Sequence, residues 1–245
     1  VLDGRGLPTF ETTQQDTITF SPDSQRLAYA VKQNDRWHAV VDGELTSAFD
    51  RILPQPFTFS PDSTHVAYIA NQNGCACAVL DGEFQGMYDN VTALAFSPDS
   101  RSLAYCAEES GEHFVVANGQ AQARFDEVGA PCFSPDGKTL AYPARRAGKW
   151  FLVEDGEQGK SYDQLSAPVF DPEGGRLAYC ARSGESWRLV VDSKEQALYD
   201  SVKDPVFSPD GTRLAYKAMR LEKGFLRRKS FAFVVLDGAP GKEYE

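Results

Sequence analysis

The stretch FSPDSQRLAY at residues 20–29 returns five more times along this chain of 245 residues. The later copies are FSPDSTHVAY, FSPDSRSLAY, FSPDGKTLAY, FDPEGGRLAY and FSPDGTRLAY. Their opening residues lie 39 residues apart once and 37 residues apart four times: Phe20, Phe59, Phe96, Phe133, Phe170 and Phe207. So regular a period is the mark of a repeat protein, in which each unit is one supersecondary element.

Each repeat carries the signals of four short strands. Ser-Pro-Asp-Gly or Ser-Pro-Asp-Ser lies between the Phe and the Leu-Ala-Tyr triplet, and these residues suit a tight turn. A run such as WHAVVDG at 37–43 then leads β-branched and aromatic residues into Asp-Gly, a strong hairpin signal. A segment ending in an aromatic-Asp pair follows, and we expect a loop from there to the next repeat. The first strand therefore ends at the Phe, and the second runs through Leu-Ala-Tyr. The third strand ends before Asp-Gly, and the fourth ends in the aromatic-Asp pair.

Four strands in about 37 residues, without helical periodicity, are typical of a β-propeller blade. A lone blade has two apolar faces and can cover neither, whereas neighbouring blades cover each other. We therefore predict an all-β fold, a six-bladed β-propeller of four-stranded antiparallel blades, closed into a single domain over residues 1–245. The chain also begins and ends with half-repeat sequences, VLDG and FVVLDGAPGKEYE, which makes residues 1–19 a surplus half repeat at the closure. The alternative is a seven-bladed ring whose last blade is incomplete.

The repeated phrase FSPDG-x-x-[LV]-A-Y, followed by a strand and an Asp-Gly turn, resembles the TolB-like, WD40-like (PD40-type) propeller repeat. That repeat is also found in the propeller domains of prolyl oligopeptidase relatives. The resemblance runs through all six copies and implies the propeller fold and a periplasmic or secreted protein. It implies little about function, because such propellers serve in binding, scaffolding and, less often, catalysis.

The amino-acid composition limits the classes of partner and the cellular location that the chain can have. A formal net charge of -10 and a pI near 4.9 disfavour nucleic acid as a partner. No apolar run approaches the roughly 18 to 20 residues that span a bilayer. Five cysteines stand in no zinc-binding spacing, and unpaired thiols favour a reducing compartment, against the location that the resemblance implies. Cys106 and Cys180 share one repeat position and are expected to be small buried residues.

Catalytic motifs are missing from the sequence: it holds no nucleophile elbow, no HExxH and no phosphate-binding loop. Nothing brings His38, His65 or His113 to a Ser or Cys. We therefore expect no enzyme, no cofactor and no metal site. Two sets of repeated aspartates are expected to cap turns or bond backbone amides within their own blades: Asp50, Asp89, Asp126, Asp163 and Asp200 in the aromatic-Asp pairs, and Asp23, Asp62, Asp99, Asp136 and Asp210 in the turns. The repeated Trp37, Trp150 and Trp187 are expected to pack between blades.

The largest irregularity is the sixth hairpin between the second and third strands, KAMRLEKGFLRRKSFAF at 217–233, which is eight residues longer than the first such hairpin. It gathers five positive charges in an acidic chain, with apolar residues between them. One reading is a solvated hairpin. The other is a docking finger for an acidic partner, which could be a protein, an anionic glycan or nucleic acid in decreasing order of preference. The candidate partner-binding residues are Arg220, Lys223, Phe225, Arg227, Arg228 and Lys229, with the connector residues Arg51, Glu127 and Lys203.

The sequence thus predicts a non-enzymatic protein-binding or scaffold propeller. Its binding face would carry the hairpins between second and third strands and the connections from fourth to first strands, because variable loops are where binding residues concentrate. The alternative is a propeller enzyme, or a propeller that gates substrates, acting on a peptide or glycan at the central channel.

Overall fold

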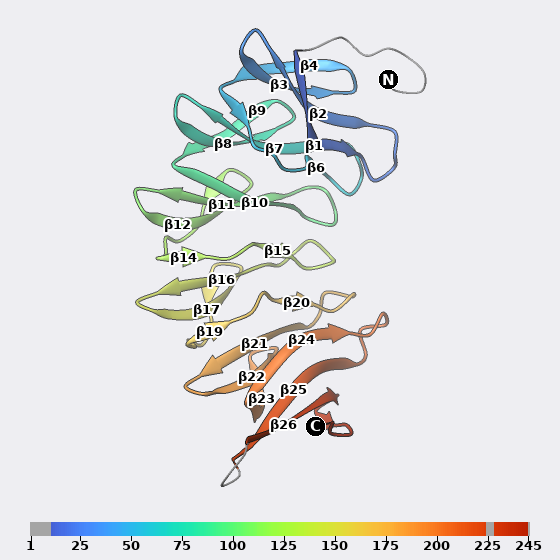
Figure 1. Ribbon diagram of the computed structural model, residues 1–245, viewed down its shortest axis with the longest axis vertical. Coiled ribbons are helices and arrows are strands. Elements are labelled where there is room, and N and C mark those ends of the chain that lie inside the picture. The colour runs from blue at the N-terminus through green and yellow to red at the C-terminus, as the bar shows by residue number, and fades with distance from the viewer. Residues whose placement is uncertain (1–10, 224–227, 245) are drawn as a thin grey trace. The chain divides into compact units, whose positions relative to one another are not determined.

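The computed structural model describes residues 11–223 and 228–244, without the side chains of Gln15, Lys223 and Arg228. Every regular element in these residues is a β-strand, as Figure 1 shows. The chain divides into two compact units, Val1–Arg124 and Phe125–Glu245. Each unit contains three of the six sheets.

The N-terminal unit holds sheets 1 to 3. Sheet 1 consists of β1 (Thr12–Phe20), β2 (Leu27–Gln33), β3 (Arg36–Val41) and β4 (Glu44–Phe49). Sheet 2 consists of β5 (Arg51–Ile52), β6 (Thr58–Phe59), β7 (Val66–Gln72), β8 (Cys75–Leu80) and β9 (Glu83–Tyr88). Sheet 3 consists of β10 (Asn90–Phe96), β11 (Leu103–Glu109), β12 (Glu112–Ala117) and β13 (Gln120–Ala121).

The C-terminal unit holds sheets 4 to 6. Sheet 4 consists of β14 (Glu127–Val128), β15 (Cys132–Phe133), β16 (Leu140–Arg146), β17 (Lys149–Glu154) and β18 (Glu157–Gln158). Sheet 5 consists of β19 (Gln164–Leu165), β20 (Val169–Phe170), β21 (Leu177–Ser183), β22 (Ser186–Val191) and β23 (Lys194–Tyr199). Sheet 6 consists of β24 (Ser201–Phe207), β25 (Leu214–Lys223), β26 (Arg228–Leu236) and β27 (Ala239–Pro240).

All six sheets are antiparallel meanders that follow the predicted strand order. In sheets 2, 4 and 5 the first strand is broken into two short pieces that pair with the same second strand, as β5 and β6 do with β7. In sheets 1, 3 and 6 it is continuous but its register shifts, as between Thr92 and Ala95. The predicted four-stranded repeat is therefore confirmed. Residues 12–19, expected in a surplus half repeat, belong to β1 of sheet 1, residues 1–10 lie outside the described residues, and closure of the ring stays a prediction.

Neighbouring sheets within a unit share a core, because successive side chains of the second and third strands point to opposite faces. In sheet 5, Cys180 and Leu189 face sheet 6, where they meet Tyr216 and Phe233. Equivalent cores lie between sheets 1 and 2, sheets 2 and 3, and sheets 4 and 5. The expectations for Cys106 and Cys180 are confirmed, since both are buried free thiols and burial raises the pKa of each to about 11. Trp37 and Trp187 pack against inter-sheet cores as predicted.

The Ser-Pro-Asp turns have the predicted structural role. In sheet 1, the Ser21 hydroxyl donates to Asp23 at 2.5 Å and accepts the Arg26 amide at 2.9 Å, so one side chain closes the turn. The same arrangement recurs at Ser134, whose hydroxyl donates to Asp136 at 2.6 Å. The hydroxyl of Ser134, followed by Lys138, lowers the pKa of Asp136 to about 2.

The Asp of the Asp-Gly turn ties the third strand to the second. Asp42 accepts the Leu27 amide at 2.9 Å, and Asp237 accepts the Leu214 amide at 2.8 Å. The equivalent bond recurs in every sheet, with Asn118 replacing Asp in sheet 3. This explains why an acidic or amide side chain precedes the turn in each repeat.

The predicted loop from the aromatic-Asp pair to the next Phe is found only in part, because first-strand residues begin directly after the pair. β4 ends at Phe49 and β5 begins at Arg51, so Asp50 alone joins sheets 1 and 2. One residue also joins sheet 2 to 3 and sheet 5 to 6, whereas residues 122–126 and 159–163 join sheet 3 to 4 and sheet 4 to 5. The Asp50 carboxylate accepts the Asn73 amide at 2.6 Å, in the hairpin between β7 and β8. The aromatic-Asp carboxylates are structural, as expected, but each caps a hairpin of the following sheet rather than of its own.

Candidate functional site

The hairpin between β25 and β26 is the main departure from the repeat. These strands have 10 and 9 residues, whereas β2 and β3 have 7 and 6. The ladder of β25 and β26 holds nine residue pairs, against six between β2 and β3. The Asp200 carboxylate accepts the Leu221 amide at 2.7 Å, where an equivalent carboxylate caps the turn in other sheets. Here the strand continues past the cap, so three residue pairs extend beyond the common end of the repeat.

The charges of this hairpin are partly neutralised. The Arg220 guanidinium lies 3.0 Å from a Glu243 carboxylate oxygen and 3.7 Å from Glu222. Lys229 lies in β26 and is exposed. Phe225 and Arg227 lie outside the described residues, and Lys223 and Arg228 are described only as a paired backbone position. The exposed hairpin is thus present, while the role of its tip stays a prediction.

The three connector candidates lie in strands rather than loops, because each following strand begins directly after the Asp of the aromatic-Asp pair. Arg51 is in β5 of the N-terminal unit. Glu127 is in β14 and its carboxylate lies 2.8 Å from the Arg145 guanidinium, so its charge is already paired. Lys203 is in β24, directly opposite Lys217 of β25. Within the C-terminal unit, Lys203 therefore belongs to the same sheet as the long hairpin.

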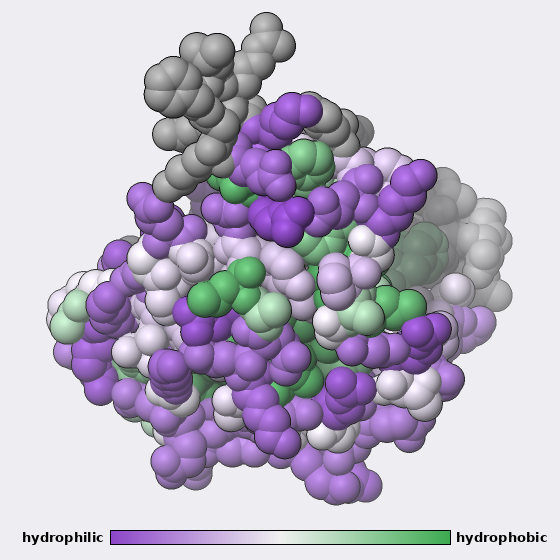
Figure 2. All heavy atoms as spheres, turned by 90° about the horizontal axis from the view of Figure 1, so that it is seen from below, coloured by the Kyte–Doolittle hydropathy of each residue, from purple (hydrophilic) through white to green (hydrophobic). Residues whose placement is uncertain are grey.

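Sheet 6 also carries a face that the sequence reading overlooked. We call it the outer face of sheet 6, the face opposite the core shared with sheet 5; it carries Lys203, Asp204, Val206, Lys217 and Val234. Val206 is 60% exposed and Val234 is 52% exposed. Figure 2 views the end of the molecule where β25 and β26 lie in Figure 1, and hydrophobic side chains reach the surface there among hydrophilic ones.

The repeat position after Leu-Ala-Tyr could have revealed this face. In sheets 1, 2 and 5 the position holds Ala30, Ile69 and Cys180, each no more than 2% exposed and packed against the following sheet. In sheet 6 it holds Lys217, whose ammonium lies 2.9 Å from Asp204 and whose side chain is 72% exposed. A charge at a position that is otherwise small or apolar is a signal readable in the alignment of the six repeats.

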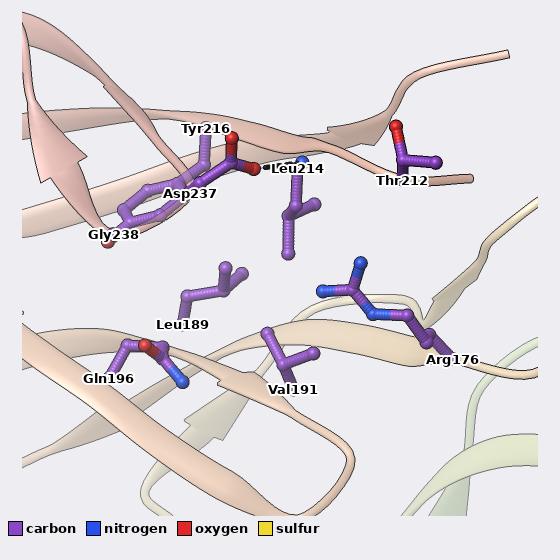
Figure 3. Close-up of a pocket in the computed structure, with 9 residues that line it drawn as sticks. All are labelled: Arg176, Leu189, Val191, Gln196, Thr212, Leu214, Tyr216, Asp237 and Gly238. Carbon is purple, nitrogen blue, oxygen red and sulfur yellow. Dashed lines mark hydrogen bonds between the residues drawn. The ribbon is translucent and has the colours of Figure 1, made fainter. Parts of the chain in front are cut away.

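A groove lies between sheets 5 and 6, near the turns at the other end of the strands from the long hairpin. Figure 3 shows Arg176, Tyr216 and Asp237 among its lining residues, and its volume is about 280 Å³. The Arg176 guanidinium lies over the Phe207 ring, 5.1 Å from its centroid. Burial, followed by the neighbouring Tyr199, raises the pKa of Tyr216. The sequence predicted a binding face at the hairpins between second and third strands, whereas this groove lies beside the Ser-Pro-Asp and Asp-Gly turns.

A second groove, of about 310 Å³, lies between sheets 4 and 5. Glu154 ends β17 in it, at the position that Val191 takes in sheet 5 and Val41 in sheet 1. Burial, followed by Asp155 and Asp192, raises the pKa of the Glu154 carboxyl. The carboxyl can accept a proton or a hydrogen bond from a donor that enters the groove.

Other chemistry is sparse in the described part of the chain. The His65 ring lies 2.6 Å from Asp81 at an Asp-Gly turn, and His38 lies 3.0 Å from the Thr46 carbonyl. Across residues 11–223 and 228–244, no three His, Cys, Asp or Glu side chains gather as a metal site would require. No helix in the same residues could serve as a membrane span.

No protein-family model matches the chain, and neither does any curated protein. Among solved structures, it is similar to a eukaryotic initiation factor, with 14% identity and a TM-score of 0.60, over 94% of this chain and 64% of the other. It is also similar to TolB from Acinetobacter baumannii, with 18% identity and a TM-score of 0.43, over 91% of this chain and 65% of the other.

A third similar structure is the β-propeller domain of the Trilobed protease from Pyrococcus furiosus, with 12% identity and a TM-score of 0.47, over 96% of this chain and 86% of the other. The chain spans less than two thirds of the initiation factor and of TolB. Likenesses at such low identity concern the fold alone, and the one to the initiation factor is consistent with the six meander sheets. The chain is an all-β propeller.

Proposed function

We propose that this propeller is a non-enzymatic protein-binding module that engages its partner with the β25–β26 hairpin side of sheet 6. The observation that carries the proposal is the hairpin's length, nine residue pairs where β2 and β3 form six. The extra pairs lie past the point where Asp200 would otherwise cap the turn, so they contribute nothing to the packing between sheets 5 and 6. An extension that the core does not need is available for recognition.

The short connections between sheets concentrate recognition on this hairpin. A single aspartate joins sheet 1 to 2, sheet 2 to 3 and sheet 5 to 6, and its carboxylate caps a hairpin of the following sheet. The first five second-to-third strand hairpins end directly at these caps. The predicted binding face therefore offers little besides the sixth hairpin.

Electrostatics favours an acidic partner. The hairpin sequence contributes Lys223, Arg227, Arg228 and Lys229 to a chain of formal net charge -10. A basic element on an acidic protein steers a negatively charged partner to one place. Protein is preferred to nucleic acid because the remaining acidic surface would repel a phosphate backbone.

The test is affinity capture from native extract with the wild-type chain, identification by mass spectrometry, and repetition with the purified partner. The variant Arg227→Glu/Arg228→Glu should weaken binding while the circular dichroism spectrum stays the same. Lys138→Glu is the matched control, because Lys138 is an exposed lysine in a Ser-Pro-Asp turn. Equal binding by all three proteins would rule the hairpin out.

A ligand-binding or catalytic role is the second candidate, and Glu154 favours it. Its raised pKa and its place in a groove are properties that catalytic carboxyls share, although structural groups show them too. A thermal-shift screen with metal ions and small peptides or sugars tests this role, since a ligand that binds only the folded state raises its stability. Stabilisation that Glu154→Gln abolishes would favour this second candidate.

A further inference from the structure

The groove between sheets 4 and 5 carries two carboxylates that the repeat does not require. We propose that this groove binds an aliphatic ammonium group, from a lysine side chain or a free alkylamine, through Glu154 and Glu157. The proposal deepens the ligand-binding candidate above, on which it rests, and it is independent of the hairpin proposal. Sheets 4 and 5 are neighbours within the C-terminal unit, so both walls of the groove belong to one unit.

Glu154 holds a repeat position that is apolar in the other five sheets. It is the last residue of the third strand, where the other sheets have Val41, Leu80, Ala117, Val191 and Leu236. Val191 and Leu80 pack against the cores that their sheets share with the following sheets. A carboxylate at this position contributes no such apolar contact, so packing between sheets 4 and 5 does not account for Glu154.

Glu154 also lies directly opposite a second carboxylate, because it pairs with Glu157 in the ladder of β17 and β18. Like charges at opposed positions of an antiparallel pair repel. The corresponding pairs in the other sheets hold at most one charge: Val41 with Glu44, Leu80 with Glu83, Ala117 with Gln120, Val191 with Lys194, and Leu236 with Ala239. A cation bound between the two carboxylates of sheet 4 would replace their repulsion by two attractions.

The chain supplies no such cation from its described residues. Arg176 borders the groove, but its guanidinium lies over the Phe207 ring of sheet 6, 5.1 Å from the centroid. The Lys160 ammonium, in the connection between sheets 4 and 5, lies 2.7 Å from a Glu195 carboxylate oxygen. Within residues 11–223 and 228–244, neither carboxylate of the groove forms an ion pair, and both residues are exposed to solvent. A cation from solution can therefore reach them.

The apolar walls indicate what the cation is attached to. The groove of about 310 Å³ adjoins a hollow of about 430 Å³, and Leu152, Glu154 and Tyr179 border both. Leu152 and Tyr179 are 5% and 4% exposed, so each presents only an edge to a ligand. Burial raises the pKa of the Tyr179 phenol, and the nearby Glu154 charge adds to the rise. An ammonium on an alkyl chain fits these walls, with its charge at the carboxylates and its chain along the leucine and the ring.

A divalent metal ion fits the groove less well. Ca²⁺ takes six to eight oxygen ligands, and Mg²⁺ requires octahedral geometry. The described part of the chain brings no three His, Cys, Asp or Glu side chains together in a metal-binding group. Two carboxylates beside an apolar wall therefore favour an organic cation.

The experiment is an NMR titration of the isotope-labelled protein at pH 7, followed through the amide resonances of residues 152–158. The probes are pentylamine, N-acetyl-lysine amide, the uncharged analogue pentanol, and magnesium chloride. We expect saturable shifts with the amines and none with pentanol. Glu154→Val, which installs the residue of sheets 1 and 5, and Glu157→Gln should each weaken amine binding about tenfold or more. Glu83→Gln is the matched control, because Glu83 takes the place of Glu157 in sheet 2 but lies opposite Leu80.

The outcomes separate this proposal from the two above it. Amine binding that both groove variants weaken, and that Glu83→Gln and Arg227→Glu/Arg228→Glu leave unchanged, supports the ammonium site. Tighter binding of N-acetyl-lysine amide than of pentylamine then assigns the site to a lysine side chain, and the reverse order assigns it to a small amine. No saturable shift with either amine, equal shifts with pentanol, tighter binding of Mg²⁺, or amine binding unchanged in Glu154→Val would each refute the proposal. Stabilisation by a sugar or an uncharged peptide that Glu154→Gln abolishes, without amine binding, would refute it and leave the ligand-binding candidate standing.

Discussion

Exchanging the residues at one repeat position tests whether the face of sheet 5 that carries Cys180 is buried and the face of sheet 6 that carries Lys217 is exposed. Cys180 in sheet 5 is buried against sheet 6, and its equivalent in sheet 6 is the exposed Lys217. Cys180→Lys places a longer, charged side chain into a close-packed core. Overpacking costs about 1–3 kcal/mol, and burial of an unpaired ammonium adds several kcal/mol more. The sum, about 4 kcal/mol or more, is a large share of the roughly 5–15 kcal/mol that stabilises a typical protein.

The reverse exchange should be nearly silent. Lys217→Cys removes an exposed ion pair with Asp204, which is worth about 0–1 kcal/mol. Cys180→Met separates size from charge, because Met is long and neutral and should cost no more than about 1–3 kcal/mol. Urea unfolding followed by tryptophan fluorescence is the assay, since Trp187 packs on the same core as Cys180. If Cys180→Lys and Lys217→Cys shifted the unfolding free energy equally, the distinction between the faces would be refuted.

Three further predictions concern stability. Phe49 is fully buried, with its ring centroid 5.8 Å from that of Tyr68. Phe49→Ala should lower the free energy of unfolding by about 3–5 kcal/mol, and a smaller loss in urea unfolding would contradict the packing of sheets 1 and 2. Asp136, whose folded pKa is about 2, adds stability that is present above its unfolded pKa near 4 and lost as pH falls towards 2; Asp136→Asn should flatten the pH profile there. Glu154 has a raised pKa, so its ionisation opposes folding above pH of about 4.5; Glu154→Gln should raise the thermal midpoint at pH 7 but not at pH 3, and equal gains at both would argue against ionisation as the cause.

The repeat and its turns were predictable because their causes are local. The Ser21 hydroxyl and Asp23 carboxylate act within one turn, and Asp42 acts across one hairpin, so a few residues of sequence contain both partners. The reach of Asp50 was not predictable in the same way. Its amide partner, on Asn73, is 23 residues away in the next sheet, and the predicted loop is interrupted by β5 directly after Asp50.

The candidate site also combines features that the sequence predicts with features that depend on which strands are neighbours. The length of the sixth hairpin and its basic residues could be counted from the repeat period alone. The pairing of Glu127 with Arg145, and of Arg220 with Glu243, depends on which strands lie side by side. Lys203 was expected in a connector and is found on a sheet face, because the first strand starts immediately after the capping aspartate.

The amino-acid sequence by itself determined the period, the strand order and the chemistry of each turn, since hydrogen bonds over 2 to 23 residues within one sheet specify them. Tertiary structure decided which faces are covered. Lys217 and Cys180 occupy one position of the same motif, yet one is exposed and the other buried. The reason is that burial depends on whether another sheet packs against the face, and that neighbour is supplied by residues far along the chain.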